Sequence, residues 1–509
     1  MIKHKLISLF VALVSAANLL AYDAYIDGIY YNLNSTDMTA EVTNETESYA
    51  AKRYYGSITI PASISYNQQT YSVTKIGNFA FSWCEGLTSI TIPNSVITVG
   101  NYAFDGCSGL TSITIPNSVI TIGYSAFYGC SSLTSVTIPN SVTTIGGGAF
   151  AHCNGLTSII VDAANTHYCA VDGVLFNYAK DTLVQYPIGN TRTEYTIPNS
   201  VTTIGYDAFF ACSGLTSVTI PNSVTTIGFA AFSSCSGLTS ITIPNSVTTI
   251  GSSAFTGCSG LTSPVFNVNC FAYMPTSYKG AYTIPDGIKQ IVGYAFFGCS
   301  GLTSVTIPNS VTTIEEYAFY GCSSLPVENN LRYADTYLVE AVDRTLSSYT
   351  IKEGTKWIGN SAFSSCSGLT SITIPNSVTT IGFAAFYKCS SLTSVTIPNS
   401  VIWIGDEAFY DCSGLNSIKC YAVVPPSIDK NTFYGVRKAI PLYVPKGSIT
   451  WYQGDTYWKE FLNMQGMDDT AIETIKKNSD SARSKFIINN SLNILHNGNL
   501  FTATGARVK

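Results

Sequence analysis

Residues 107–130 read CSGLTSITIPNSVITIGYSAFYGC, and nearly the same letters recur along the chain. Each copy contains the pair Ala-Phe, with a cysteine three residues after the phenylalanine, and the basic step is 23 residues. Such self-similarity indicates a solenoid, in which each repeat is one turn of a stacked coil. The twelve repeat phenylalanines are Phe81, Phe104, Phe127, Phe150, Phe209, Phe232, Phe255, Phe296, Phe319, Phe363, Phe386 and Phe409.

The first half of the repeat has the pattern of a β-strand. Polar and apolar letters alternate in SITI, so we expect Ile113 and Ile115 to face inward and Ser112 and Thr114 to face outward. Pro116 has no amide proton and should end the strand. The sequence therefore predicts one short strand in this part of every turn.

The second half of the repeat supplies the remaining core residues. Val119 and Ile122 begin a second inward-facing stretch, Gly123 permits a turn, and Ala126 and Phe127 provide one small and one large core side chain. One turn cannot form a core alone, whereas stacked turns can.

Composition and charge exclude several classes of function. Charged residues make up 11% of the 509 residues, against roughly 25% in an average soluble protein. The formal net charge is −5, and loss of Lys3 and Lys5 with the leader described next would leave −7. No basic patch points to nucleic acid or to anionic lipid.

The N-terminus has the features of a secretory signal peptide. A basic start, an apolar run over residues 6–20 and the small residue Ala21 predict cleavage after residue 21. No later apolar run reaches the ~20 residues that a membrane helix needs. We therefore expect an exported mature chain without a membrane span.

Three longer intervals interrupt the repeats. The inserts, at about 160–195, 264–283 and 326–350, contain strand-like runs, which we interpret as β-hairpins on one edge of the solenoid. Since open strand edges at both ends would invite aggregation, we also expect atypical caps. The predicted order is a signal peptide at 1–21, an N-terminal β cap at 22–75, repeats at 76–412, a degenerate last repeat with a C-terminal cap at 413–466, a linker at 467–485 and a β-like tail at 486–509.

Fifteen cysteines in an exported chain first suggest disulfides. Twelve of them share one position of the repeat, where stacking would place them about 4.8 Å apart. We interpret these as a ladder of buried thiols that behave as small apolar side chains. Cys169, Cys270 and Cys420 lie outside this register, and Cys169 and Cys270, both in inserts, are the better disulfide candidates.

The sequence contains no pattern typical of catalysis, metal binding or cofactor binding. No C-x-x-C pair, H-E-x-x-H motif or glycine-rich phosphate loop occurs. The histidines His152, His167 and His496 show no metal-ligand spacing, and the serines recur at solvent positions without a nearby base. We therefore predict no enzyme, no metal and no cofactor.

Two kinds of surface remain for binding. Thr91, Thr114, Thr137, Thr219, Thr242, Thr306, Thr373 and Thr396 form outward files, which could bind a repetitive polymer or could simply be solvated. Aromatic residues follow the repeat phenylalanine in six copies, and they could be binding anchors or could merely cover the neighbouring turn. These candidate binding residues are Tyr128, Phe210, Phe297, Tyr320, Tyr387 and Tyr410.

With these motifs, the chain resembles the BspA-type leucine-rich repeats of bacterial surface proteins over roughly 57–447. The resemblance implies a right-handed, β-rich leucine-rich-repeat solenoid, here of about 12 coils, located at the cell surface or secreted. It also implies adhesion to host matrix proteins, host cells or other bacteria. The tail after residue 485 resembles a C-terminal sorting segment of exported Bacteroidetes proteins, with NGNLF and GARVK as its matching letters.

Three functions are compatible with this sequence. The first is a recognition protein whose partner is an extracellular protein or a glycan. The second is a glycan-binding accessory protein that uses the Ser/Thr files and the tyrosines. The third is a structural spacer, since solenoid architecture alone specifies no partner.

Overall fold

The computed structural model describes residues 22–45, 54–467, 484–488, 491–496 and 499–502. The chain forms two compact units, the first ending at residue 328 with 332–339 added, and the second comprising 329–331 and everything from residue 340. Each unit is a β-solenoid. The predicted signal peptide and most of the predicted linker lie outside the described residues.

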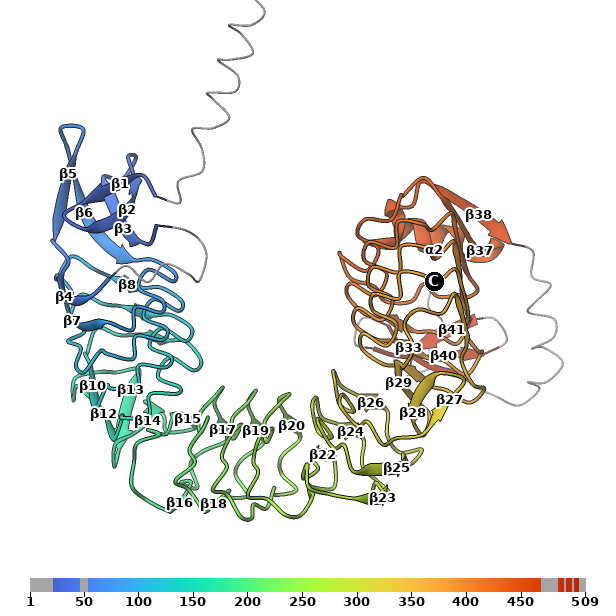
Figure 1. The fold of residues 1–509 in the computed structure, drawn as a ribbon, viewed down its shortest axis with the longest axis horizontal. Coiled ribbons are helices and arrows are strands. Elements are labelled where there is room, and N and C mark those ends of the chain that lie inside the picture. Colours follow the sequence, from blue (N-terminus) through green and yellow to red (C-terminus); the bar gives the residue numbers. More distant parts are fainter. Residues whose placement is uncertain (1–21, 46–53, 468–483, 489–490, 497–498, 503–509) are drawn as a thin grey trace, which may run out of the picture. The chain divides into compact units, whose positions relative to one another are not determined.

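Short parallel strands, most of them two residues long, recur along each unit, in three separate sheets in the first unit, and are called here the T-I ladder. In the first unit, Thr98, Thr121 and Thr144 are direct neighbours, so residues 23 apart share one position. Figure 1 shows β17, β19 and β20 side by side, with β16 and β18 along the opposite edge. The first-unit strands are β6 (Gln69–Ile76), β8 (Thr98–Val99), β9 (Thr121–Ile122), β11 (Thr144–Ile145), β15 (Thr182–Gln185), β17 (Thr203–Ile204), β19 (Thr226–Ile227), β20 (Thr249–Ile250), β22 (Cys270–Tyr273), β24 (Gln290–Ile291) and β26 (Thr313–Ile314). Those of the second unit are β31 (Trp357–Ile358), β33 (Thr380–Ile381) and β35 (Trp403–Ile404).

The strand predicted in the first half of the repeat forms in only some turns. In the opening repeat, residues 111–116 belong to no strand, although Ile115 is buried and Thr114 exposed as predicted. The alternation thus predicts which side chains are buried, but it does not ensure pairing. The strands that do form are β4 (Gly56–Thr59), β7 (Leu87–Thr91), β10 (Ser135–Ile138), β12 (Ser158–Val161), β16 (Glu194–Thr196), β18 (Ser217–Thr219), β23 (Gly280–Thr283), β25 (Leu302–Thr306), β30 (Ser348–Thr350), β32 (Ser371–Thr373), β34 (Ser394–Ile397) and β36 (Ser417–Cys420).

Stacked phenylalanines form the centre of the core. The rings of Phe81, Phe104, Phe127 and Phe150 follow one another at centroid distances of 5.1, 5.2 and 5.4 Å, with planes 1–3° apart. This spacing is close to the ~4.8 Å between paired strands. The ladder therefore dictates the stacking.

The solenoid has about 17 turns, more than the 12 coils predicted. The inserts contain antiparallel pairs, but they also add turns. In the first insert, β13 (Tyr168–Val171) and β14 (Val174–Asn177) form a hairpin, whereas β15 pairs in parallel with β17. Tyr186 then stacks on Phe209 at 5.2 Å, in the place of a repeat phenylalanine. Because this turn lacks the Ala-Phe signature, the repeat pattern does not count it.

The other inserts also contribute strands. β21 (Val265–Phe266) is antiparallel to β22, which pairs in parallel with β24. The third insert contains β27 (Val327–Glu328), β28 (Leu331–Ala334) and β29 (Tyr337–Ala341). Insertion has therefore altered turns as well as interrupted them.

Both ends of the solenoid carry atypical elements. At the start, β1 (Ala24–Ile26), β2 (Ile29–Asn34) and β3 (Thr39–Thr43) are antiparallel, and β3 pairs in parallel with β6. The strand β5 (Ser63–Tyr66) is antiparallel to β6. The buried Tyr54 ring lies 4.6 Å from the ring of Phe81, the first of the phenylalanine stack. An aromatic side chain thus covers the open end of the stack.

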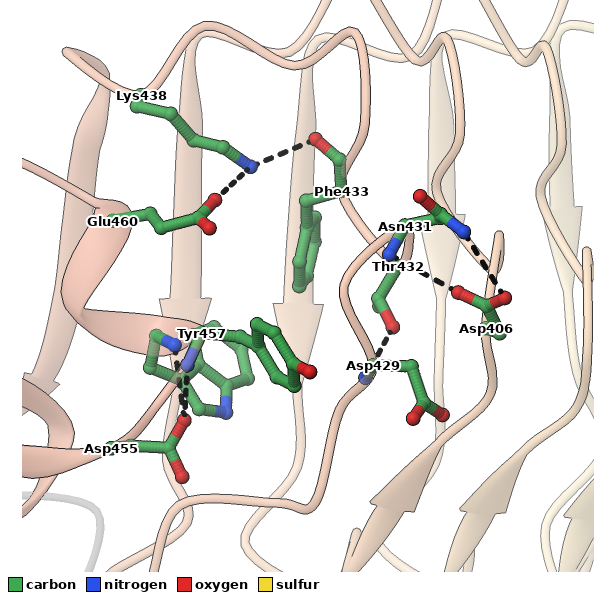
Figure 2. Close-up of polar contacts among 10 residues, drawn as sticks. Asp406, Asp429, Asn431, Thr432, Phe433, Lys438, Asp455, Tyr457 and Glu460 are labelled. Atoms are coloured by element: carbon green, nitrogen blue, oxygen red, sulfur yellow. Dashed lines mark hydrogen bonds and ion pairs between the residues drawn. The ribbon is translucent and has the colours of Figure 1, made fainter. Parts of the chain in front are cut away.

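At the other end, Phe433 continues the stack 5.1 Å beyond Phe409. The rings of Trp458 and Phe461 contact the Phe433 ring. The ammonium group of Lys438 donates a hydrogen bond to the Phe433 carbonyl oxygen and forms an ion pair with the Glu460 carboxylate (Figure 2). This cap contains β37 (Pro441–Pro445), the short helices η1 (Lys446–Ser448), α2 (Ile449–Gly454) and η2 (Trp458–Glu460), and β38 (Asn463–Met467).

The tail contains three antiparallel strands, β39 (Ser484–Ile488), β40 (Ser491–His496) and β41 (Asn499–Thr502). Among the described residues, no helix combines the length and apolar character needed to cross a membrane.

The turn between the T-I ladder and the cysteine requires left-handed backbone, often at two positions. In the repeat at residues 107–130 these positions are Ser125, with φ 48°, and Gly129, with φ 70°. Glycine adopts such angles without strain, whereas other L-residues do so at a cost of roughly 1–2 kcal/mol. Ala211, with φ 56°, occupies a position that is glycine in other turns.

We expect Ala211→Gly to increase the free energy of unfolding by about 0.5–1 kcal/mol, because relief of the left-handed strain exceeds the added flexibility of glycine. Ala208→Gly is the matched control. Ala208 is fully buried in the same turn and has no positive φ. Removal of its methyl group should therefore destabilise the chain by about 1 kcal/mol. Denaturant unfolding of both variants measures the difference. A decrease in stability for Ala211→Gly would contradict the strain argument.

Candidate functional site

The repeat cysteines form a ladder of thiols that donate hydrogen bonds to backbone. The Sγ of Cys130 lies 3.2 Å from the carbonyl oxygen of Phe104, which is 26 residues earlier. The same contact, at 3.0–3.2 Å, recurs at Cys107, Cys130, Cys153, Cys235, Cys258, Cys322, Cys389 and Cys412. The interpretation as buried thiols is correct, and each of these thiols also binds a carbonyl oxygen of the preceding turn.

All fifteen cysteines lie in the described part of the chain, and none of them is in a disulfide. Cys169 and Cys270, the better disulfide candidates by sequence, therefore form no disulfide. Cys169 contacts the carbonyl oxygen of Asn177 within its own hairpin at 3.3 Å, and Cys270 is buried in β22. Burial raises the pKa of Cys130 well above its usual range and raises that of Cys258 to about 12. Buried neutral thiols of this kind are chemically inert.

The described part of the structure brings together no cluster of metal ligands. Within those residues, no group of three or more His, Cys, Asp or Glu side chains could hold a metal ion. His152 stacks on Tyr128, and His167 contacts the neighbouring Thr166 hydroxyl. His496 lies in β40, where only the backbone is described.

The six predicted aromatic anchors lie in three separate groups. Tyr128 and Phe210 form one group with His152 in the first unit, where the two rings are 6.0 Å apart. Phe297 and Tyr320, which are 37% and 54% exposed, stack at 5.8 Å. Tyr387 and Tyr410 stack at 5.1 Å in the second unit. The anchors therefore do not form one continuous site.

The group in the second unit continues into a residue that the sequence analysis missed. Tyr434 stacks on Tyr410 at 4.7 Å and is 55% exposed. Tyr387, Tyr410 and Tyr434 are called here the tyrosine row. The repeat pattern missed Tyr434 because its turn reads TFYGV, with Thr432 in place of alanine and Val436 in place of cysteine.

The rings of the tyrosine row cover one another. Their planes are 21° and 18° apart, so each inner ring face is occupied by a neighbouring ring. Lys388 holds its ammonium group 5.2 Å from the Tyr387 ring. The row consequently presents ring edges and hydroxyl groups to solvent, in positions held by stacking.

The first unit carries a longer aromatic surface, on the segments between its T-I ladder and its repeat cysteines. The Tyr124 ring lies 5.3 Å from the Tyr206 ring at 80°, next to the group of Tyr128, His152 and Phe210. These five residues are called here the aromatic edge. All are half-buried except the exposed His152.

A buried carboxylate belongs to this aromatic edge. Asp207 is 6% exposed, and among the described residues its carboxylate makes no hydrogen bond or ion pair. Burial raises the pKa of Asp207 to about 7. The pKa of Tyr128 is also raised, first by burial and then by the negative charges of Asp207 and Asp105. Both carboxylates therefore lie within electrostatic reach of Tyr128.

The threonine files are exposed as predicted, but their strand support is interrupted. All eight threonines point to solvent. Residues 111–116 and most of 240–244 are not in strands, so the files lack a continuous paired sheet beneath them. This weakens the comparison with a flat, regular binding face.

The T-I ladder exposes a further variable file that the sequence analysis overlooked. In many turns its outward positions hold threonine, as at Thr379 and Thr380. In the turn of β35 the same positions hold Ile402, just before the strand, and Trp403, its first residue, and both side chains are exposed. The letters between Val and Ile in the second half of the repeat are the signal that could have revealed it.

Comparison with known proteins identifies the repeats. The family model described as "BspA type Leucine rich repeat region" matches six copies, over residues 53–170, 189–278, 266–338 and 341–455. No curated protein matches the chain.

Several solved structures resemble the chain. A leucine-rich repeat protein from Bacteroides ovatus shares 27% identity over 88% of this chain and 100% of its own, with a TM-score of 0.32. A leucine rich cell surface protein from Faecalibacterium prausnitzii shares 27% over 87% and 98%, with a TM-score of 0.32. A leucine-rich repeat protein from Eubacterium ventriosum shares 22% over 81% and 93%, with a TM-score of 0.41.

We expect thiol titration to separate the cysteines by burial. In the native protein at pH 8, Ellman's reagent should modify about one thiol quickly, that of the half-buried Cys169, because the other fourteen are buried. In denaturant all fifteen should react. Cys169→Ser should abolish the fast native reaction. Rapid modification of several repeat cysteines would show that the thiol ladder is open to solvent.

We expect the carboxylate of Asp207 to make stability depend on pH. Its folded pKa, about 7, exceeds the 3.8 of an ordinary aspartate, so its protonated form favours folding, and this contribution is lost as pH rises from about 4 through 7. Asp207→Asn should therefore be more stable than the parent at pH 8, by up to about 4 kcal/mol, and this advantage should nearly vanish at pH 4.

The control for this comparison is Asp286→Asn, at an exposed aspartate, which should change the unfolding midpoint little at either pH. Thermal unfolding at both pH values supplies the readout. An equal effect of Asp207→Asn at pH 4 and pH 8 would mean that the carboxyl group is not held at a raised pKa.

Proposed function

Since the chain belongs to the BspA-type leucine-rich repeat family, whose members are cell-surface proteins, we propose that it is a non-enzymatic adhesion protein. It recognises an extracellular protein, on host matrix, host cells or other bacteria, through aromatic side chains on the turns of the solenoid. The tyrosine row is the observation that carries this proposal.

Stacking prepares the tyrosine row for binding. Ordering a free side chain at an interface costs about 0.5–1.5 kcal/mol, and rings already held against one another avoid much of this cost. Tyrosine also combines a large apolar area with a hydroxyl group, which makes it one of the residues most enriched at binding hot spots. Three such rings, with successive centroids 5.1 and 4.7 Å apart, form a compact anchor.

The same geometry disfavours the glycan-binding alternative at this place. A sugar ring packs its C–H face against the face of an aromatic ring, but the inner faces of the tyrosine row are occupied by neighbouring tyrosines. Among the described residues, the outer faces of Tyr387 and Tyr434 have no ring against them, and the ammonium group of Lys388 lies 5.2 Å from the Tyr387 ring. A protein partner, which can use ring edges and hydroxyl groups, suits this surface better.

The test is a binding screen with the purified full chain. Immobilised fibronectin, fibrinogen and epithelial cells represent the protein partners, and a glycan array represents the alternative. Changing Tyr387, Tyr410 and Tyr434 together to Ser should weaken binding to the protein partner at least tenfold, as expected for hot-spot residues. Tyr55 and Tyr178, exposed tyrosines outside the row, changed to Ser provide a matched control that should retain binding.

The remaining outcomes are equally informative. Specific glycan hits without binding to protein or cells would replace adhesion by the glycan-binding function. No binding in any assay, with every phenotype intact in the triple variant, would favour a structural spacer.

A further inference from the structure

An exposed tryptophan stands in the turn that follows the first repeat phenylalanine. Trp83 comes two residues after Phe81, and its side chain is 43% exposed. No other repeat has tryptophan at this position. The ring is therefore a variable feature of the surface and no part of the repeat pattern. Five of the twelve copies have glycine there, namely Gly106, Gly129, Gly257, Gly298 and Gly321.

The backbone at this position does not favour a large side chain. Trp83 has φ 59°, in the left-handed region, where a bulky residue is an outlier. Gly106 holds the equivalent position in the next turn, with φ 68°, and glycine adopts such angles without strain. Backbone outliers of this kind cluster at functional sites. The strained tryptophan thus marks this turn as a candidate binding site.

The indole of Trp83 lies flat against the backbone of the next turn. A Cβ placed on Gly106 would lie 2.9, 3.0 and 3.4 Å from the Trp83 atoms Cε3, Cδ2 and Cζ3. Cδ2 is a ring-fusion carbon without a hydrogen atom, so these similar distances place Gly106 against the face of the ring and not against its rim. A side chain at position 106 would displace the indole.

The opposite face of the Trp83 ring is open. In the described part of the chain, no aromatic ring and no cationic side chain is stacked on it, and nearly half of the side chain is exposed. In the tyrosine row, by contrast, neighbouring rings cover the inner faces. Trp83 thus offers a flat apolar surface that the backbone beneath it holds in place.

A second exposed ring lies at the other end of the same turn. Tyr55 is 65% exposed, and a Cβ on Gly86 would lie 2.5 Å from its Cδ1 atom. Gly86 follows Trp83 by three residues, which span at most about 11 Å. The turn between them is tight, because the amide of Glu85 donates a hydrogen bond to the Trp83 carbonyl oxygen at 2.9 Å. Trp83 and Tyr55 therefore flank one short turn.

This geometry suits a sugar better than a protein partner. A pyranose ring presents C–H groups on one face, and their partial positive charge packs against the negative face of an aromatic ring. Such stacking needs only one open ring face. A tryptophan at a protein hot spot usually fills a pocket of its partner, whereas Trp83 lies against Gly106 and cannot project into one. Two rings that flank one short turn also suit successive residues of one glycan chain.

We propose that Trp83 and Tyr55 bind a glycan chain, with each ring stacked on one pyranose residue. The pair is called here the glycan platform. This inference goes beyond the proposed adhesion to a protein, and it does not depend on the tyrosine row. Because the indole is already held in place, binding orders little of the protein surface.

The test titrates the full chain with four neutral oligosaccharides, namely cellohexaose, laminarihexaose, mannohexaose and chitohexaose. Isothermal titration calorimetry and tryptophan fluorescence measure binding. We expect at least one of them to bind and to shift the emission to shorter wavelength, because stacking removes water from the indole of Trp83. Trp83→Ala should abolish this shift and weaken binding about tenfold or more, and Tyr55→Ala should weaken binding by a smaller factor.

Two further variants serve as controls. Trp83→Phe keeps a flat ring at the same place and should retain most of the affinity. Trp451→Ala is the matched control, because Trp451 is 45% exposed but lies in α2, in the C-terminal cap. This variant should bind the oligosaccharide as the parent does. A cooperative unfolding transition close to that of the parent would show that each variant is folded.

Three results would overturn the proposal. The first is the absence of binding for all four oligosaccharides at millimolar concentration. The second is binding that survives Trp83→Ala. The third is loss of attachment to fibronectin, fibrinogen or cells in Trp83→Ala when the parent binds no oligosaccharide, which would make Trp83 a contact for a protein partner.

The outcome is separable from that of the adhesion proposal, because free oligosaccharides contain no protein. If the oligosaccharides fail to bind while attachment to a protein still depends on the tyrosine row, the glycan platform is wrong and the adhesion function stands. If an oligosaccharide binds through Trp83 but no protein or cell partner is found, the glycan platform stands and the adhesion function fails.

Discussion

The spacing of paired parallel strands is the constraint on which the rest of the structure depends. Residues 23 apart become neighbours in the T-I ladder, and the ladder places neighbouring turns about 4.8 Å apart. This distance allows flat rings to stack, and the rings of Phe81, Phe104 and Phe127 are nearly parallel at 5.1 and 5.2 Å. It also brings each repeat thiol to a carbonyl oxygen of the turn before it, as at Cys130. One spacing therefore explains why the same letters are required in every turn.

The same constraint acts on the surface. A side chain on one turn lies about 5 Å from the equivalent side chain on the next turn. Aromatic residues at equivalent variable positions can therefore stack as the core phenylalanines do. Tyr387, Tyr410 and Tyr434 form such a stack, whereas Phe297 and Tyr320 form a shorter one. Aromatic surfaces on this solenoid are consequently stacked rows, and their extent depends on how many successive turns carry an aromatic residue.

The sequence predicted the side chains of the core better than the backbone that holds them. Alternation in SITI indicated that Ile115 is buried, yet residues 111–116 form no strand, because side-chain periodicity reports burial and not hydrogen-bond partners. The count of turns was too low because some turns lack the Ala-Phe signature, as where Tyr186 takes the place of a repeat phenylalanine. Of the candidate binding residues, Tyr434 was missed for the same reason, and the pairing of Tyr128 with Phe210 depends on the path of an insert that repeats do not predict. Asp207 gave no signal in the sequence, since its burial results from a glycine in another turn.

Asp207 also shows how irregularity can create chemistry in a repetitive fold. Its turn follows the first insert, and the preceding full turn carries three glycines in succession, Gly146, Gly147 and Gly148. In a regular stack, a side chain at position 148 would occupy the place of the Asp207 carboxylate, so the carboxylate could not be buried there. Because Gly148 has no side chain, the Asp207 carboxylate can lie beside it, close to the aromatic edge. An unpaired buried acid destabilises the fold at neutral pH.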